Sequence, residues 1–406
     1  MKFYKEVYKD IYWVGANDRR LKRFENMFPL TNGVTYNSYL IKDEKNVVMD
    51  SVDGSVTRQY LENIEEVLGG EDLDYLVVQH MEPDHCGSID FLLERYPECK
   101  MVGNAKTFKF FEQFYNDKYT DRYMEVKDGD ELEIGNRTLK FVFTPMVHWP
   151  EVMMTYVTDE GLLFSADAFG AFDALEGHLD ASKYIHSDRW MNENRRYYIN
   201  IVGKHGRMVM NAFKKIDGLP INGIFPLHGP IYKDEKSISI IFDKYNHWAS
   251  FEPEEKGVCI VFASMYGNTE LAADLLANEL ADLGADIIRI YDVSDTDFSY
   301  IISDCHRYSN TVFAPINYNA DNYHKMDAFL RELVGTGYSN RHVSFLNNWS
   351  WGGKSLEQAK EVLEKGKHTY VGEDVKINSS VKEQQYEEIK ALAKAIKEDL
   401  DSQEIK

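Results

Sequence analysis

Four side chains that can bind a metal ion fall within a six-residue stretch, directly after a predicted buried strand. They are His80, Glu82, Asp84 and His85, in the segment Gln79-His80-Met81-Glu82-Pro83-Asp84-His85-Cys86-Gly87. The apolar run at residues 76–78 predicts the strand. No lysine or arginine balances the acids in this segment. The chain must therefore fold so that the strand end holds this loop around a cation, unless the loop is only a polar surface turn.

Three further candidate ligands support the metal interpretation. Residues 141–144, 162–165 and 224–227 are strand-like runs, and they lead to His148, Asp167 and His228. A single histidine after a strand is more often a hydrogen-bonded structural residue. Four such sites in one segment are more specific, because the strands of a layered sheet present their ends along one edge, where distant residues converge.

The combined set contains four histidines, two aspartates and one glutamate. One metal ion takes four to six ligands, so seven ligands suggest two metal ions that share a carboxylate. Asp167 is the natural bridge, because it is the only acid in its loop and can offer one oxygen to each ion. Nitrogen and oxygen ligands together suit Fe, Mn or Zn, and the anionic oxygens favour a metal that reaches the trivalent state. A structural zinc site would be closed and usually rich in cysteine.

This segment resembles the metallo-β-lactamase fold, whose metal motif is His-x-His-x-Asp-His. Here Glu82 stands at the second histidine, and that variant is typical of the flavodiiron proteins, also called A-type flavoproteins. The resemblance covers nearly the whole chain and implies an αββα sandwich. It also implies that His80, Glu82 and His148 hold one iron, that Asp84, His85 and His228 hold the other, and that Asp167 bridges them. No catalytic residue is expected beyond these ligands.

A second region predicts a phosphate site. The apolar strand at residues 258–262 is followed by Ser264-Met265-Tyr266-Gly267-Asn268-Thr269 and by a helical pattern from Leu271. In such a turn the backbone N–H groups and the helix N-terminus face an anion, and Ser264 and Thr269 add hydroxyl donors. The turn lacks the lysine of a nucleoside-triphosphate loop. A monophosphate such as that of FMN therefore fits better than a triphosphate.

Two later loops agree with a flavin site. Each follows a predicted strand, at residues 312–314 and 343–346, and each carries aromatic and amide side chains that can sandwich a flat ring. Strands alternate with helices here, as in a doubly wound sheet, whose ligands sit at the carboxyl ends of the strands. The region resembles flavodoxin, although its middle loop departs from the usual Ser-Pro-Thr pattern. The alternative for Trp349 and Trp351 is core packing. The predicted FMN-binding residues are Ser264, Met265, Tyr266, Gly267, Asn268, Thr269, Pro315, Ile316, Asn317, Tyr318, Asn319, Asn348, Trp349, Ser350, Trp351 and Gly352.

Length and composition set further limits. The 406 residues predict a metallo-β-lactamase-like α+β domain at 1–252 and a flavodoxin-like α/β domain at 256–406, joined by a charged linker at 252–257. With 46 Lys+Arg against 67 Asp+Glu, the net charge is −21, which disfavours nucleic-acid binding. The four scattered cysteines, the absence of an apolar signal core and the lack of a membrane-length apolar run predict a cytoplasmic protein. Residues from 380 onward predict a closing amphipathic helix.

An FMN that feeds two irons forms a four-electron device. We therefore expect a flavodiiron oxidoreductase that reduces O₂ to water, NO to N₂O, or both, and that scavenges these gases in an anaerobe. The resemblance implies a head-to-tail homodimer and, as electron donor, a separate rubredoxin or alternatively reduced F420. A dizinc hydrolase and a flavin electron carrier with a disused metal region are the competing classes. Tyr197 and Tyr198 are candidate proton or hydrogen-bond donors, with core packing as the alternative, and Trp149 is a candidate pocket wall.

Overall fold

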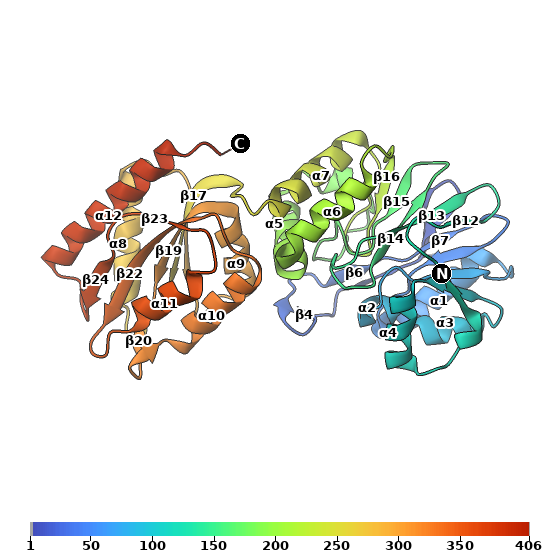
Figure 1. Ribbon diagram of the computed structural model, residues 1–406, viewed down its shortest axis with the longest axis horizontal. Coiled ribbons are helices and arrows are strands. Elements are labelled where there is room, and N and C mark those ends of the chain that lie inside the picture. Colours follow the sequence, from blue (N-terminus) through green and yellow to red (C-terminus); the bar gives the residue numbers. More distant parts are fainter. Residues whose placement is uncertain (1–2, 406) are drawn as a thin grey trace. The chain divides into compact units, whose positions relative to one another are not determined.

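The computed structural model describes residues 3–405, which form two compact units. One unit contains the residues up to 198 together with 207–246, and the other contains 199–206 together with the residues from 247 onward. Figure 1 shows both units with their elements labelled. The last part of the expected linker is already strand, because β17 begins at Glu255. The predicted domain limits, 1–252 and 256–406, stay a prediction.

The first unit contains a mixed seven-stranded sheet in the order β1-β2-β7-β8-β9-β10-β11. Its first four strands pair antiparallel, and β8, β9, β10 and β11 pair parallel. The strands are β1 (Lys5–Tyr8), β2 (Ile11–Trp13), β7 (Tyr39–Ile41), β8 (Val47–Met49), β9 (Tyr75–Val77), β10 (Lys100–Gly103) and β11 (Tyr123–Glu125).

A five-stranded sheet lies against it, in the order β12-β13-β14-β15-β16. Its strands are β12 (Glu131–Glu133), β13 (Thr138–Phe143), β14 (Met153–Val157), β15 (Leu162–Phe164) and β16 (Gly223–Phe225). Two small ribbons accompany the sheets, β3 (Ala16–Asp18) with β6 (Val34–Tyr36) and β4 (Arg23–Phe24) with β5 (Phe28–Pro29). Strands β8, β14, β15 and β16 are buried along their whole length, which is typical of sheets covered on both faces.

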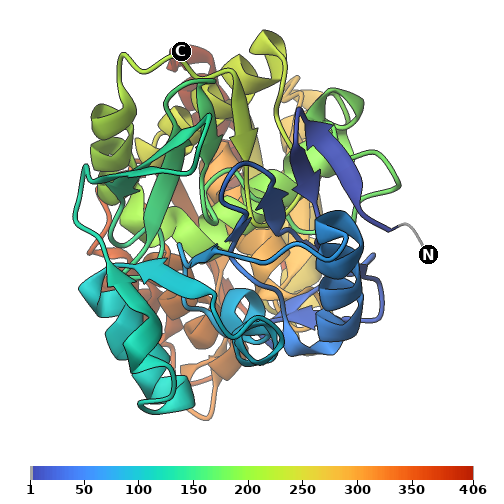
Figure 2. The same cartoon turned by 90° about the vertical axis from the view of Figure 1, so that its right-hand side faces the viewer.

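Helices cover the outer faces of both sheets, which completes the predicted αββα sandwich (Figures 1 and 2). Helices α1, α3 and α4 lie outside the seven-stranded sheet, and α6 and α7 lie outside the five-stranded sheet. The helices of this unit are α1 (Thr57–Leu68), α2 (Pro83–Cys86), α3 (Ile89–Arg95), α4 (Ala105–Tyr115), α5 (Asp188–Tyr197), α6 (Gly206–Ile216) and α7 (Glu235–Ala249).

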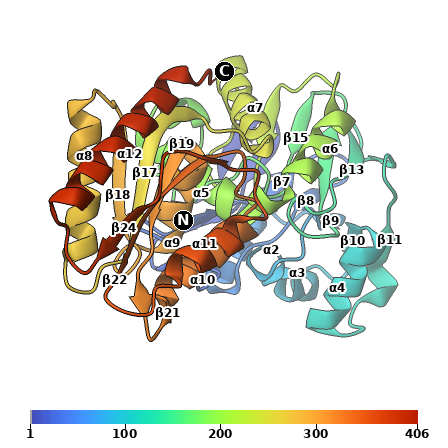
Figure 3. The same ribbon diagram turned by 60° about the vertical axis from the view of Figure 1, so that its left-hand side comes forward.

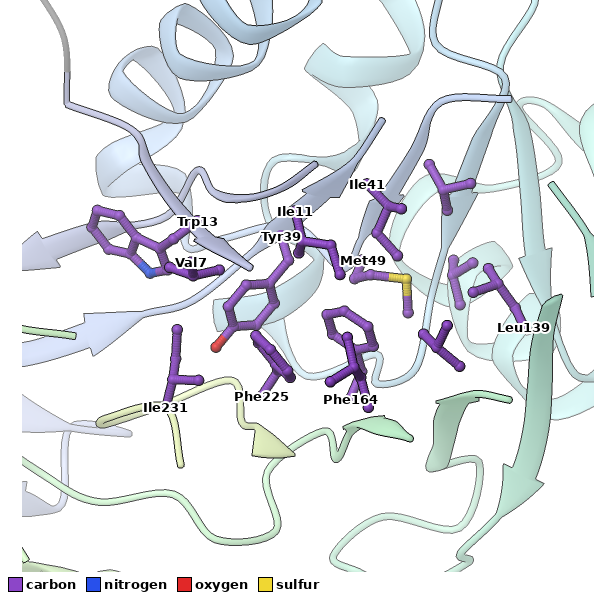
Figure 4. Close-up of a cluster of buried hydrophobic side chains, with 14 of the residues drawn as sticks. Val7, Ile11, Trp13, Tyr39, Ile41, Met49, Leu139, Phe164, Phe225 and Ile231 are labelled. Carbon is purple, nitrogen blue, oxygen red and sulfur yellow. The ribbon is translucent and has the colours of Figure 1, made fainter. Parts of the chain in front are cut away.

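The core between the two sheets is apolar and contains several aromatic rings (Figure 4). The rings of Tyr39, Phe164 and Phe225 contact one another with centroid separations of 4.9–5.4 Å. The hydroxyl of Tyr39, which is fully buried, donates to the carbonyl of Pro226 at 2.8 Å. This contact joins the seven-stranded sheet to the segment that leads from β16 to His228, so the core fixes one of the predicted ligand loops.

The second unit is a parallel sheet in the order β18-β17-β19-β22, with β23 and β24 both paired to β22. This is the doubly wound order 2-1-3-4-5 of flavodoxin, so the predicted fold class is confirmed. The strands are β17 (Glu255–Phe262), β18 (Ile288–Asp292), β19 (Tyr308–Ala314), β22 (His342–Trp349), β23 (Thr369–Tyr370) and β24 (Val375–Asn378), with a small hairpin of β20 (Asn317–Tyr318) and β21 (Asp321–Asn322).

Helices lie on both faces of the parallel sheet (Figure 3). Helices α8 and α12 pack together on one face, and α9, α10 and α11 lie on the other. The helices of this unit are α8 (Asn268–Asp282), α9 (Phe298–Arg307), α10 (His324–Gly335), α11 (Ser355–Leu363) and α12 (Glu383–Ser402), of which α12 is the predicted closing helix. Within residues 3–405, no helix combines the length and the apolar content needed to cross a membrane.

Replacing Phe164 by Ala tests the core of the first unit. We expect the free energy of unfolding to fall by about 3–5 kcal/mol, because a fully buried aromatic ring leaves a cavity. Guanidinium-induced unfolding followed by circular dichroism measures this change. The matched control is Phe91→Ala on α3, where the ring is 51% exposed and the expected loss is below about 0.5 kcal/mol. Equal losses in the two variants would contradict this assignment of the core.

Candidate functional site

The motif segment leaves β9 and enters the short helix α2, and a buried aspartate fixes its course. Asp50 Oδ1 accepts from the backbone N–H groups of Gln79 at 2.8 Å and His80 at 3.1 Å, while Oδ2 accepts from the Gln79 side chain at 2.8 Å. Pro83 occupies the first turn of α2, where its missing N–H costs nothing. Glu82 thus precedes the helix, and Asp84 and His85 lie within it.

Four predicted ligands gather into one buried group: His80, Glu82, His148 and Asp167. Nε2 of His148 lies 3.0 Å from Oε2 of Glu82 and 3.0 Å from Oδ2 of Asp167. Nε2 of His80 lies 3.2 Å from the same Glu82 oxygen and 3.5 Å from Asp167 Oδ2. All four side chains are at most 9% exposed, so water does not separate these groups.

The remaining three predicted ligands form a second group: Asp84, His85 and His228. Oδ2 of Asp84 lies 3.1 Å from Nε2 of His228 and 3.4 Å from Nε2 of His85. Asp167 also faces this group, because its Oδ1 lies 3.0 Å from Nε2 of His85 and 3.7 Å from Nε2 of His228. Asp167 therefore presents one oxygen to each group, which is the arrangement of a bridging carboxylate.

Unpaired buried atoms test whether this arrangement fits two metal ions. Both oxygens of Asp84, Oδ1 of Asp167 and the Nε2 atoms of His85 and His228 have no hydrogen-bond partner among the described residues. Buried polar atoms without partners are costly, and here they all face one another. Nitrogen and carboxylate oxygen donors suit iron, manganese or zinc. The residues present therefore fit a pair of such ions.

The electrostatics of the group agree with a cation site. Burial by itself would lower the pKa of His148, but hydrogen bonds that its ring donates to Asp167 and Glu82, together with the charges of these acids, raise the pKa to about 9. Burial likewise opposes protonation of His85, and the charges of Asp84 and Asp167 raise its pKa to about 9. Burial would raise the pKa of Asp167, but the imidazoles hold it well below its usual range. The carboxylates thus stabilise positive charge at this place.

The hydrogen-bond partners of two ligand histidines, on the ring nitrogen that faces away from the ligand groups, were not predicted from the sequence. Nδ1 of His80 lies 2.8 Å from Oε1 of Glu151, and Nδ1 of His228 donates to the carbonyl of Thr35 at 2.9 Å. Both bonds turn the Nε2 atoms toward the ligand groups. Glu151 could have been suspected as an acid inside the apolar stretch that follows His148, whereas a backbone carbonyl such as that of Thr35 leaves no sequence signal.

A cavity of about 520 Å³ leads to the ligands from outside. Its lining includes Glu82 and Asp84, the aromatic residues Phe24 and Tyr36, and Glu25 in the turn between β4 and β5. The ligand groups can therefore be reached by a small molecule from this side. Most of the lining is polar, because it also includes Arg23, Asn26 and Asp53.

Three aromatic residues whose roles could not be predicted from the sequence, Tyr197, Tyr198 and Trp149, have different neighbours in the structure. Tyr197 is fully buried, and its ring packs 5.6 Å from the ring of His228. The hydroxyl of Tyr197 has no hydrogen-bond partner in residues 3–405. Tyr198 packs against Tyr245 at 4.8 Å. Trp149 contacts His80 edge-on at 5.3 Å, so it forms part of the wall around the ligands.

Cys86 is close to the ligands in sequence but takes no part in either group. Its buried thiol donates to the carbonyl of Met81 at 3.3 Å. Burial raises the pKa of this thiol, which disfavours the thiolate that binds metals.

In the second unit, the first predicted FMN loop turns directly into α8. Gly267 adopts a left-handed conformation (φ 85°) immediately before the helix, and its N–H donates to the hydroxyl of Ser264 at 3.1 Å. Thr269 is buried, while Met265 and Tyr266 are 47% and 91% exposed. A helix N-terminus with a glycine turn and a nearby hydroxyl fits a phosphate, and a nearly free aromatic ring fits a flat cofactor.

The two other predicted loops lie beside the first one, because β17, β19 and β22 are neighbours in the sheet. Asn319 and Ala320 both have positive φ, as a tight turn between β20 and β21 requires. The carbonyl of the Asn317 side chain accepts from the Ser355 hydroxyl at 2.6 Å, whereas its buried NH₂ group has no partner among the described residues. A free buried donor at this edge fits the polar rim of a flavin.

The third loop is shorter than the sequence suggested. Asn348 and Trp349 still belong to β22, and the side chain of Asn348 donates to the carbonyl of Ser379 at 3.1 Å. Trp351 is 65% exposed, so core packing is excluded for this residue, while Trp349 is half-buried. The predicted FMN residues therefore converge on one sheet edge, and within them the Asn348 side chain already has a protein partner.

The comparisons with known proteins agree with both units. Residues 34–229 match the family described as ODP family beta lactamase, and residues 260–389 match the flavodoxin family. An uncharacterized protein of Methanocaldococcus jannaschii, MJ0732, is 33% identical over 358 residues, which cover 88% of each chain. The anaerobic nitric oxide reductase flavorubredoxin of Escherichia coli is 30% identical over 363 residues, which cover 88% of this chain and 74% of that protein.

A solved structure extends the similarity to the whole fold. The rubredoxin oxygen:oxidoreductase from the anaerobe Desulfovibrio gigas superposes with a TM-score of 0.92 and 26% sequence identity, over 98% of this chain and 99% of that one. The flavodoxin-family domain implies FMN, and flavodiiron relatives carry a diiron centre to which the His/Asp/Glu cluster corresponds. This chain is an oxidoreductase of the flavodiiron protein family.

Proposed function

We propose that the protein reduces O₂ to water, NO to N₂O, or both, at a non-haem diiron site fed by FMN. The observation that carries the proposal is the position of Asp167 between two buried groups of ligands, with one oxygen facing each. O₂ takes four electrons and four protons to give two waters, and two NO take two electrons and two protons to give N₂O and water. When bound, the irons and FMN supply these electrons and a Lewis acid.

We propose the following ligand assignment. His80, Glu82 and His148 hold one iron, Asp84, His85 and His228 hold the other, and Asp167 bridges them. The phosphate of FMN lies at residues 264–269, and its ring system lies between residues 315–319 and 348–352. The exposed rings of Tyr266 and Trp351 support this arrangement, because large aromatic side chains are seldom left so exposed without a partner.

The chain's own residues prepare the site for a small oxidant. The carboxylates of Glu82 and Asp167 hold the imidazole of His148 in place. The cavity beside the ligands is large enough for a small oxidant. Tyr197 keeps its proton, because burial and the charge of Asp167 raise the pKa of its hydroxyl well above the usual value. The Tyr197 O–H is therefore able to donate a hydrogen bond beside the ligands, a second role besides its packing against His228.

The setting of the reaction is part of the proposal. We propose a cytoplasmic protein of an anaerobe that scavenges O₂ or NO, with a separate rubredoxin as electron donor and reduced F420 as the alternative donor. The relatives named as a rubredoxin oxygen:oxidoreductase and as a flavorubredoxin support the first donor. The buried carboxylate-rich ligand set and the fused flavodoxin-family domain weigh against a hydrolase, and the complete ligand set weighs against a pure electron carrier.

Stopped-flow measurement under anaerobic conditions tests the reaction. Reduced, iron- and FMN-loaded protein is expected to consume O₂ or NO, and Asp167→Asn is expected to lose at least about 100-fold in rate together with most of its iron. Iron per chain and the visible flavin spectrum are measured in the same samples. Loaded wild-type protein that converts neither gas would refute the proposed function.

Subunit complementation tests the proposed head-to-tail homodimer. Asp167→Asn removes the bridge, and Asn268→Glu places a negative charge in the phosphate site at an exposed first-turn position that favours acids. The heterodimer of these two variants is purified by two different tags. In a head-to-tail arrangement, the FMN of the Asp167→Asn subunit would face the intact iron pair of the Asn268→Glu subunit. Activity of about half the wild-type value is then expected.

Its controls are the two homodimers, Asp167→Asn and Asn268→Glu, which are both expected to be inactive. Electron transfer within one subunit would leave the heterodimer as inactive as its parents, and that result would rule out the head-to-tail arrangement. Sedimentation of a strictly monomeric species with full turnover would do the same.

Metal uptake is expected to release protons. The pKa values of His85 and His148 in the metal-free protein are raised to about 9, so both imidazoles are protonated at pH 7 and must lose a proton to bind metal. The apparent affinity for Fe²⁺ should therefore rise with pH up to about 9. Anaerobic calorimetry of metal-free protein in two buffers of different ionisation enthalpy counts the protons. Uptake without proton release, or an affinity that falls between pH 7 and 9, would contradict the ligand assignment.

A further inference from the structure

The two proposed iron positions have equal sets of direct ligands. Each position has two imidazoles and one carboxylate of its own, and the two share Asp167. The formal charge around the two ions is therefore the same. The direct ligands therefore do not determine which of the two ions gives up an electron more readily.

The difference lies behind the imidazoles. Nδ1 of His80 lies 2.8 Å from the carboxylate oxygen Oε1 of Glu151, and both side chains are 0% exposed. On the other side, His228 donates its Nδ1 proton to a neutral carbonyl, that of Thr35. Nδ1 of His85 has no hydrogen-bond partner in the described part of the chain. Of these three histidines, only His80 is bonded to a negatively charged group.

A second buried acid, Asp50, places negative charge near His85 on the other side. Both oxygens of Asp50 accept hydrogen bonds from the backbone N–H groups of Gln79 and His80 and from the Gln79 amide side chain. No ring nitrogen bonds to Asp50 in these contacts, so it fixes the loop rather than one imidazole. In the described part of the chain, Glu151 is therefore the acid outside the two ligand groups that hydrogen-bonds to a ligand imidazole.

Glu151 is held firmly enough to act in this way. Its Oε1 also accepts from the backbone N–H of Met81 at 2.9 Å. Its own carbonyl accepts from the side chain of Asn104 at 2.6 Å, and Asn104 caps the N-terminus of α4. The Asn104 bond fixes the backbone of Glu151, and the carboxylate cannot turn away from His80 without also losing its bond to the Met81 N–H.

We infer that Glu151 is a positioning residue that makes the iron beside His80 the one that is oxidised first. A carboxylate that accepts the Nδ1 proton makes the imidazole a stronger electron donor through Nε2, and it adds negative charge near the ion. Both effects stabilise the trivalent ion relative to the divalent one, which lowers the reduction potential on that side only. This inference rests on the proposed function, because it requires two irons in the cluster.

Potentiometric titration of the complete iron- and FMN-loaded protein, monitored by electron paramagnetic resonance, tests the inference. Loss of one electron from the iron pair gives a mixed-valent state, and its amount reports the separation of the two iron potentials. In Glu151→Gln the side chain keeps its size but loses its charge. We expect the lower iron potential to rise by an amount equivalent to at least a tenfold change in equilibrium, about 59 mV, while the upper iron potential and the FMN potentials move less.

Two further variants serve as controls. Glu151→Asp keeps the charge and is expected to keep the wild-type separation. Asn104→Ala loosens the same loop without touching the carboxylate, so it should lower stability and leave both iron potentials unchanged. If Glu151→Gln does not bind iron, the Glu151→Asp variant becomes the test. A wild-type separation of the two iron potentials in Glu151→Asp supports the inference, whereas loss of iron in both variants overturns it.

The inference also fails if Glu151→Gln loads two irons and shows an unchanged separation, or if both iron potentials move equally. That failure is distinct from failure of the proposed function. Wild-type protein that binds two irons and consumes O₂ or NO keeps its proposed function whatever the Glu151 variants show, whereas wild-type protein that binds no iron removes the basis of both.

Discussion

The pairing of buried imidazoles with buried carboxylates around Asp167 is the interaction on which the first unit depends. The fully buried aspartate faces Nε2 atoms on both of its oxygens, at 3.0 Å from His148 and from His85. A buried carboxylate is costly unless positive charge surrounds it. Without the histidines Asp167 would be an unpaired charge in the core, and without Asp167 and its acidic neighbours the Nε2 atoms of the imidazoles would lose the carboxylates that face them. The same mutual dependence makes the cluster a site for cations.

The scaffold of the first unit explains how ligands from distant parts of the sequence come together. The motif loop follows β9 of the seven-stranded sheet, whereas His148, Asp167 and His228 follow β13, β15 and β16 of the five-stranded one. The ligands therefore come from both layers of the sandwich, and the aromatic core that joins the layers sets the spacing between them. In the second unit the predicted FMN loops come together more simply, because parallel strands bring their carboxyl ends to one edge of the sheet.

Most of this arrangement could be predicted from the sequence, because each predicted ligand follows its own strand within a few residues of the chain. Four ligands lie within one short segment, and each of the others follows an apolar run. The exact ends of the strands were less predictable. Asn348 and Trp349 continue β22, because β24 pairs with them, and local sequence does not reveal this pairing. The roles of Glu151 and of the Thr35 carbonyl also depend on packing between segments, so they could hardly be predicted from local sequence. The exposure of Trp351 could not be read from composition, which is equally compatible with a core residue.

The central claim is that two irons lie on either side of Asp167. Anomalous diffraction at the iron absorption edge, from crystals of protein purified with its native metal, tests this most directly. We expect two iron peaks, one bounded by His80, Glu82 and His148 and the other by Asp84, His85 and His228, with Asp167 between them. A single peak, or peaks that appear at the zinc edge and vanish at the iron edge, would contradict it.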